Sequence, residues 1–471
     1  MPEDSDKSPE DEFRDMLREL LSGNGSFDPS QLAGAAGLPS DPASLAALMS
    51  QLQGALQSNG DGINWDTSLQ QAKTIAGDGA RDTTPEQRVE YEQAFHIASL
   101  WLADVTDVAE LSSEPALYTR TRWATKTMPF WTQLAEPVAT NIANALTGVL
   151  TERAPEELSG MIANAGQLVR GIGGTLFAMQ LGQVVGQLSK EVVSGGDIGI
   201  PLLDDNEAAL VPQNVADFGE GLDIPADQVQ IYLAVRELAH ARLFRHARWL
   251  RLHLISSITD FARGIRIDTE RLEELAESFD PSNPEELREA MTSGALIPAR
   301  TESQEASLAR LETTLALIEG WVDVVTAAAT VRLPRSAAIA ETVRRRRAAG
   351  GPAEQALGAL VGLELRPRRL REAAMMWQQV TDAVGTAQRD ALWSHPDLVP
   401  TAADIDAPDA LVARLEAEAR GERPEQDEMD LALEDLLRDE ERGEAARDDQ
   451  ARTDEPGPDS SDPDGTGGPP V

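Results

Sequence analysis

The sequence predicts a mainly α-helical fold, on two observations. The 471 residues are 41% hydrophobic but only 4% aromatic, so the core must be built chiefly from Ala, Leu and Val. That composition favours close-packed helices, because sheets are enriched in aromatic and β-branched residues. The most regular segment, residues 307–331, repeats apolar residues in alternating steps of three and four, the period of a helix with one buried face. The apolar positions of that face are Leu308, Leu311, Leu315, Ile318, Val322, Val325 and Ala329.

A helix start signal lies near the beginning of the predicted compact region. Thr84, Pro85 and Glu86 combine a capping residue, a proline suited to the first turn and an early acid. We expect a helix from this point to about Leu111. His96 lies in it among apolar residues, and we expect a hydrogen-bonded core histidine rather than a metal ligand.

Composition divides the chain into three predicted regions. Residues 1–64 are polar and punctuated by Gly and Pro, and they hold two short amphipathic helical patterns, at 13–21 and 41–56. We expect this region to be flexible, with its helices docking on the same chain or on a partner. Residues 65–415 should form the compact helical domain. Residues 416–471 are acidic and almost free of apolar residues towards their end, which predicts a largely disordered tail.

The charge and the cysteine content exclude several classes of function. A formal net charge of −39 repels nucleic acid and anionic lipid, so we expect no nucleic-acid partner. Cysteine is absent, which rules out disulfides and Cys-ligated zinc. The polar, acidic N-terminus lacks the basic and apolar regions of a secretory signal. We therefore expect a cytoplasmic protein.

Residues 171–188 form the best membrane candidate, because they carry no charge. They are barely long enough to span a bilayer, and repeated glutamine would be unfavourable in lipid, so we expect a buried helix and no membrane span. Small residues also recur there at intervals of four, at Ala178, Gly182 and Gly186, which would let another helix approach closely.

Two arginine clusters stand out in this acidic chain, at residues 344–347 and 366–371. Taken alone, such clusters would suggest a phosphate-binding patch. The overall charge favours ion pairing with the protein's own acids instead.

The predicted helix over residues 231–254 holds the strongest functional signal. It contains Arg236-Glu237-Leu238-Ala239-His240, which is the zinc-peptidase pattern H-E-x-x-H with arginine in place of the first histidine. In the intact pattern two histidines one helical turn apart bind the metal, and the glutamate activates the bound water. Residues 197–227, a predicted loop region, lead directly into this helix and are expected to form a wall of the site.

The helix over residues 307–331 offers a second group of acids beside its apolar face, at Glu312, Glu319 and Asp323. Such acids are usually solvated, but they would face inward if a partner helix supplied a cation or a metal. Glu319 and Asp323 have the Glu-x-x-x-Asp spacing of thermolysin-like enzymes, in which the glutamate is the third zinc ligand and the aspartate orients a ligand histidine.

Four blocks together resemble the zincin-like metalloprotease family of high-GC Gram-positive bacteria, whose members are often labelled as hydrolases. The blocks are RELAHARLF…WLR (236–251), LALIEGWVDVV (315–325), GLELRPRRLREAA (362–374) and RDALWSHPDLVPTAADID (389–406). The resemblance spans roughly residues 65–415 and implies a multi-helix zincin-like domain.

Carried over by position, the resemblance makes Glu237 the general base, His240 a zinc ligand and Glu319 the third ligand. Asp323 becomes the orienting residue or a substitute ligand. Arg236 falls where the metal-binding branch has its first histidine. The implied cofactor is Zn²⁺, and the implied substrate or partner is a peptide or protein.

Arginine in the motif leaves two hypotheses open. Arginine stays protonated and cannot donate a lone pair to zinc. Under the first hypothesis the chain is a zinc-dependent peptidase or related hydrolase with a degenerate motif and one unconventional ligand. Under the second it is a catalytically inactive zincin-like scaffold or binding protein, in which Arg236 pairs with Glu319 or Asp323 and replaces the metal. A third idea, a membrane-surface or nucleic-acid protein, has little support at this net charge.

Three further histidines are candidates for the missing ligand. His246 lies six residues after His240, but in a continuous helix that spacing turns it about 240° away. His253 follows on the same segment, and His395 lies in a predicted loop. An ordinary hydrogen-bonded histidine is an equally good interpretation of each.

Overall fold

The protein is described by a computed structural model covering residues 63–152, 159–204, 206–263, 301–351, 355, 358, 360, 362 and 367–421. The predicted helices at 13–21 and 41–56, and most of the predicted acidic tail, lie outside these residues. The chain divides into two compact units, Met1–Pro408 and Asp409–Val471. The proposed domain limits at residues 65 and 415 remain predictions.

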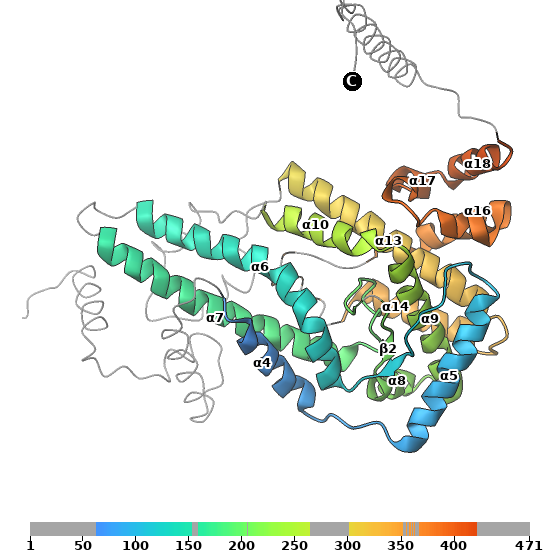
Figure 1. The fold of residues 1–471 in the computed structure, drawn as a ribbon, viewed down its shortest axis with the longest axis horizontal. Coiled ribbons are helices and arrows are strands. Elements are labelled where there is room, and N and C mark those ends of the chain that lie inside the picture. Colours follow the sequence, from blue (N-terminus) through green and yellow to red (C-terminus); the bar gives the residue numbers. More distant parts are fainter. Residues whose placement is uncertain are drawn as a thin grey trace, which may run out of the picture. The chain divides into compact units, whose positions relative to one another are not determined.

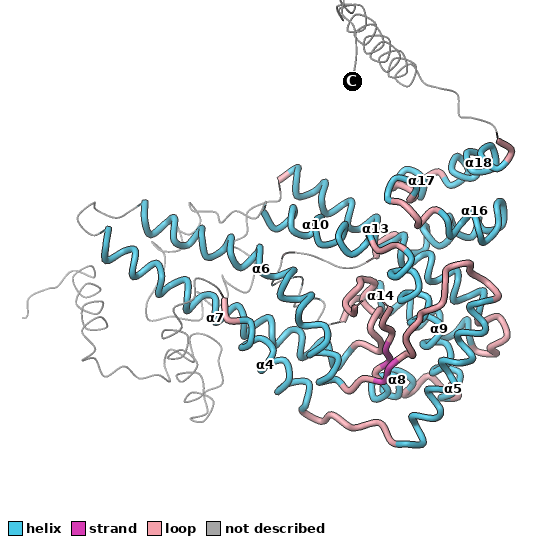
Figure 2. The backbone as a smooth tube through the Cα atoms, in the orientation of Figure 1, coloured by secondary structure: helices cyan, strands magenta, loops and turns pink. Residues whose placement is uncertain are grey.

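The prediction of a mainly α-helical fold is confirmed (Figures 1 and 2). In chain order the described elements are α4 (Trp65–Gly77), α5 (Pro85–Ala103), β1 (Ala116–Leu117), α6 (Arg120–Glu152), α7 (Ser159–Glu191), β2 (Ala209–Leu210), α8 (Pro212–Gly219), α9 (Ala226–His246), α10 (Trp249–Arg263), α13 (Glu302–Ala329), α14 (Ser336–Ala349), α16 (Leu370–Ala391), η2 (Pro396–Leu398), α17 (Ala402–Asp406) and α18 (Pro408–Ala419). Within the described residues β1 and β2 form one short parallel pair, with Ala116 opposite Ala209.

The start of α5 is the one that the sequence predicts. Thr84 and Gln87 form a capping box, in which each side chain accepts the other residue's backbone N–H, and Pro85 opens the helix. The helix ends at Ala103, earlier than the predicted limit near Leu111. His96 is exposed, so its assignment to the core was wrong: the buried face of α5 is formed by its neighbours, including Phe95 and Ala98.

Helices α4 and α7 pack closely through the small residues that the sequence singles out. A Cβ on Gly182 would lie 2.9 Å from Cα of Ser68, and one on Gly186 would lie 2.8 Å from Cβ of Ile75. The Ser68 hydroxyl also donates to the carbonyl of Ala178 at 2.6 Å. The glutamines that argue against a membrane helix, Gln180, Gln183 and Gln187, lie along the exposed face of α7. No helix in the described part of the chain combines the length and apolar character needed to cross a bilayer.

Helix α9 is the interior element of the larger unit, in contact with α5, α8, α13, α14 and β2 (Figure 1). Thirteen of its residues are buried, in an almost continuous run from Val229 to Leu243. Helix α13 packs beside it and buries every position of the predicted apolar face. A helix enclosed on all sides must find partners for its polar side chains inside the protein, because an unpaired buried polar group is strongly destabilising.

Candidate functional site

Helix α9 carries the motif residues into the core, where Arg236, Glu237 and His240 are 4%, 1% and 1% exposed. Arg236 and His240 lie one helical turn apart on the same face, as the spacing predicts. Helix α13 brings Glu319, which is fully buried, to that face. The two helices that the sequence selects therefore meet at the motif.

Arg236 forms a buried ion pair with Glu319, in which its Nη2 donates to Oε2 of the carboxylate. Burial opposes the charge on both groups. The pair outweighs burial, because Glu319 raises the pKa of Arg236 while Arg236 and Arg347 hold the pKa of Glu319 well below its ordinary value. Both groups therefore stay charged at neutral pH. One turn before Arg236, burial raises the pKa of Tyr232 to about 12, so its hydroxyl stays neutral.

The other carboxylate oxygen of Glu319 faces His240. The distance from His240 Nε2 to Glu319 Oε1 is 3.4 Å, while Nδ1 of the ring lies 3.1 Å from the carbonyl oxygen of Arg236. Two ligand atoms of a tetrahedral zinc, each about 2.0–2.2 Å from the metal, are about 3.3 Å apart. His240 and Glu319 therefore retain the spacing of two ligands of one metal ion.

Glu237 binds the backbone. Its Oε2 accepts from the N–H of Gly196 at 2.8 Å, and its Oε1 accepts from the N–H of Ala209 at 2.9 Å. Burial raises the pKa of Glu237, and these hydrogen bonds, together with one from Ser194, oppose that rise. Both oxygens of the residue that the resemblance makes a general base are thus engaged in holding a loop and β2.

Helix α14 directs three of its arginines at acids around the site. Arg344 donates to both oxygens of Asp323, with its shortest contact at 2.9 Å. Arg346 pairs with Asp197 at 2.9 Å, and Arg347 Nε lies 3.7 Å from Glu319 Oε1. Each arginine of the 344–347 cluster pairs with an acid of the protein, Arg345 at the surface with Glu341, as the interpretation as ion pairs predicts.

A loop, residues 193–204, is buried up to residue 203 and lies directly against the motif, and we call it the covering segment. A Cβ on Gly196 would lie 2.7 Å from Cβ of His240, and one on Gly195 would lie 2.9 Å from Oε1 of Glu237. Gly199 has a φ of +79°, and a Cβ there would collide with Oε1 of Glu319. Of these contacts, that of Gly199 lies in residues 197–227, the region expected to form a wall of the site, whereas Gly195 and Gly196 precede it. The predicted loop region also contains β2 and α8, which the sequence analysis did not foresee.

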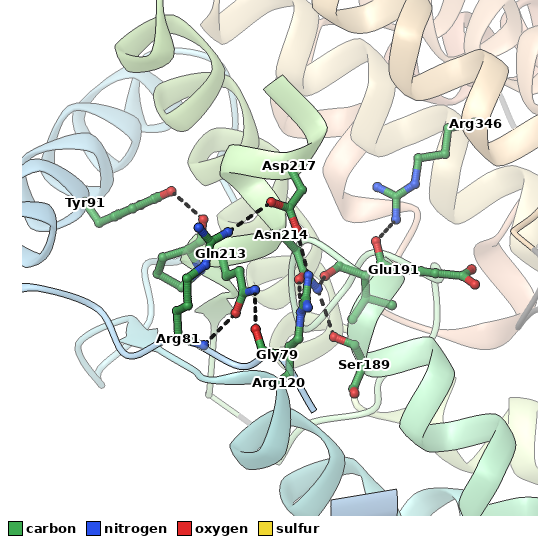
Figure 3. Close-up of polar contacts among 12 residues, drawn as sticks. Gly79, Arg81, Tyr91, Arg120, Ser189, Glu191, Gln213, Asn214, Asp217 and Arg346 are labelled. Carbon is green, nitrogen blue, oxygen red and sulfur yellow. Dashed lines mark hydrogen bonds and ion pairs between the residues drawn. The ribbon is translucent and has the colours of Figure 1, made fainter. Parts of the chain in front are cut away.

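The covering segment is fixed where it leaves α7 (Figure 3). The Asn214 side chain donates to the carbonyls of Ser189 and Val192 at 2.9 and 2.5 Å, and it accepts from Arg120 at 2.6 Å. Arg346 donates to the carbonyl of Glu191. These side chains satisfy carbonyls at the C-terminal end of α7 that have no partner within the helix.

A small cavity lies between the covering segment and α9. Its volume is ≈ 20 Å³, and it is lined by Gly195, Gly196, Ile200, Pro201, Leu202, Leu203, Asp204, Asn206, Glu207, Glu237, Ala241 and Phe244. A space of that size holds about one water molecule. It does not hold a peptide.

The donor set does not fit a catalytic zinc ion. Such a site needs three protein ligands beside the water. His240 and Glu319 have the right mutual spacing, but Arg236 holds a guanidinium at the third position and Asp323 is bound by Arg344. Among the described residues, no three His, Asp or Glu side chains converge as a metal site would require.

The three histidines proposed as replacement ligands lie elsewhere. Helix α9 continues through His246, which is exposed. His253 lies 3.4 Å from the hydroxyl of Thr314 and packs edge-on against Trp249. His395 is exposed and caps the short helix η2.

Sequence reasoning did not identify Arg347 or the glycines of the covering segment as residues of the site. The arginine cluster and the run Gly195-Gly196-Asp197-Ile198-Gly199 were both visible. Neither pattern predicts which acid the arginines will pair with or which side chains the glycines will contact, since that depends on how α14 packs against α9 and α13.

Comparisons with known proteins agree with this fold. A family model described as "Zincin-like metallopeptidase" matches residues 63–412. A crystal structure from Chloroflexus aurantiacus, described as a "putative hydrolase with a novel fold", superposes with a TM-score of 0.51 at 18% identity, covering 75% of this chain and 99% of that one. At that identity the likeness concerns the fold alone. None of the curated protein sequences compared with the chain matches it.

Proposed function

We propose that this chain, which belongs to the zincin-like metallopeptidase family, is a non-catalytic member that serves as a scaffold or binding protein. One observation carries the proposal: the guanidinium of Arg236 is bound to Glu319, the carboxylate that the family resemblance makes a zinc ligand. A fixed cation thus neutralises that carboxylate without a metal. The remaining acids of the motif then serve to hold the core together.

The surroundings of Glu237 support the same proposal. A general base must reach a water molecule next to the scissile bond. Both carboxylate oxygens of Glu237 instead accept hydrogen bonds from backbone N–H groups, and the covering segment packs against Glu237 and against His240. The adjacent cavity of ≈ 20 Å³ has no room for a substrate peptide.

The family gives the chemical class of the proposed partner. Peptidases act on peptides and proteins, so we propose a peptide or protein segment as the partner of this chain, bound outside the small cavity at the motif. Its net charge of −39 disfavours nucleic acid in that role.

Metal analysis tests the proposal directly. The full chain is expressed with zinc supplied, purified without chelators and analysed for zinc, and its hydrolysis of a mixed peptide library is measured. We expect far less than one zinc per chain and no hydrolysis above that of Glu237→Gln. Stoichiometric zinc, with hydrolysis that Glu237→Gln abolishes, would overturn the proposal.

A zinc-dependent hydrolase is the second candidate. It is favoured by the 3.4 Å spacing of His240 and Glu319, which suits two zinc ligands. This candidate requires Arg236 to leave Glu319 and another residue to complete the metal site. The outcome that overturns the first proposal supports this one.

A further inference from the structure

We propose that Arg347 acts together with Arg236 in place of the metal. Two guanidinium groups, from α9 and α14, then prevent zinc from binding at the motif. This inference rests on the proposed non-catalytic function and extends it to a residue outside the zincin motif. It predicts that restoring the motif histidine alone will not restore a metal site.

The two oxygens of Glu319 face different cations. Oε2 accepts from Arg236, whereas Oε1 is approached by His240 Nε2 at 3.4 Å and by Arg347 Nε at 3.7 Å. Changing Arg236 therefore frees only one of the two oxygens. The oxygen that shares the ligand spacing with His240 is the one beside Arg347.

The position of Arg347 is fixed by its surroundings. Its residue is 4% exposed, and its Nη2 donates to the carbonyl of Ile198 in the covering segment at 2.7 Å. The neighbouring Arg346 holds the same segment through Asp197. Arg347 thus bridges Glu319 and the covering segment, and it cannot turn to solvent without breaking contacts on both sides.

A positive charge in that place opposes a second cation strongly. Zinc bound by His240 and Glu319 Oε1 would lie within a few ångströms of the Arg347 guanidinium, in surroundings of low dielectric. Arg347 would also compete for the electron density of Oε1. Both effects reduce zinc affinity even when residue 236 is a histidine.

The test compares zinc affinity in three full-length variants: Arg236→His, Arg347→Gln and the double variant. Glutamine removes the charge and keeps a polar N–H donor on a shorter side chain. Zinc is titrated against a chromophoric chelator, and bound metal is counted by elemental analysis. We expect the double variant to bind one zinc, Arg236→His to bind it on the order of a hundredfold more weakly, and Arg347→Gln to bind none.

Charge is separated from shape by combining Arg236→His with Arg347→Lys, which we expect to bind zinc as weakly as Arg236→His. If the glutamine double variant does not fold by circular dichroism, Arg347→Met replaces it with the same expectations. The inference is overturned if either Arg236→His or its combination with Arg347→Lys binds zinc as tightly as the glutamine double variant. It is also overturned if the folded double variant binds no zinc. Zinc in the wild-type protein would instead refute the proposed function, so the two failures are distinguishable.

Discussion

Replacing Glu319 by glutamine should destabilise the protein severely, because it removes the negative charge that holds the site together. The substitution keeps the size of the side chain. It leaves the guanidinium groups of Arg236 and Arg347 buried, at 4% exposure each, without their common carboxylate. Removing one partner of a buried ion pair typically lowers the free energy of unfolding by about 3–5 kcal/mol. Two buried cations lose a nearby carboxylate, which places the expected loss at the upper part of that range.

A matched control lies two turns earlier on the same helix. Glu312 pairs with Arg368 at 3.7 Å, but their side chains are 25% and 57% exposed. A pair in contact with solvent contributes about 0–1 kcal/mol. Glu312→Gln therefore makes the same chemical change in α13 without stranding a buried charge, and it should cost less than about 1 kcal/mol.

Equilibrium urea unfolding followed by circular dichroism at pH 7 gives the comparison. Adding Arg236→Met to Glu319→Gln should return part of the lost stability, because it removes the buried cation that had paired with Glu319. If Glu319→Gln were no more destabilising than Glu312→Gln, the buried ion pair would not hold the site together, and the structural role assigned to Arg236 would be wrong.

Three further predictions concern the same site. The difference in stability between the wild type and Glu319→Gln should be constant above pH 4.5, the ordinary pKa of a glutamate. In thermal melts at lower pH this difference should shrink as the pH falls towards the lowered pKa of Glu319 in the folded protein, because the carboxylate then takes up a proton. Glu237→Gln should lower the free energy of unfolding by about 1–3 kcal/mol in urea titrations, because its amide nitrogen cannot accept from a backbone N–H. Gly199→Ala should lower the melting temperature more than Gly221→Ala. The two glycines have similar φ angles, +79° and +77°, but only a Cβ at Gly199 would meet a side chain, that of Glu319. Equal decreases in melting temperature would show that the covering segment can move away from Glu319.

The helices were accessible from the sequence, because they depend on spacing along one helix, and the pairing of Arg236 with Glu319 on another helix followed from the arginine in the zinc-peptidase motif. The apolar period of α13 predicts which face is buried, and all seven of its apolar positions are buried. Because Glu319 lies beside that face in the predicted helix, its carboxylate could have faced either solvent or a buried cation. The arginine at position 236 favoured the internal cation, since it occupied the place of a metal ligand on the facing helix.

The covering segment and α14 were not accessible in the same way. Their contacts with the motif join residues far apart in the chain, such as Gly196 with Glu237 and Arg347 with Glu319. No periodicity links those positions. His96 shows the same limit within one helix, because apolar neighbours in sequence placed it in the core while the rotation of α5 turns it to solvent.

The retained acids of the motif have a physical explanation that does not require catalysis. A zinc ion brings two positive charges to its ligands, and here Arg236 and Arg347 bring two guanidinium charges to Glu319. Once those cations are buried, the carboxylate is needed to neutralise them, and its loss destabilises the fold whether or not any peptide is cleaved. Glu237 is needed for a different structural reason, because it accepts from backbone N–H groups of the covering segment and of β2 and so joins them. A chain can therefore keep the residues of a peptidase motif through the demands of its core, and the presence of such residues is by itself no sign of activity.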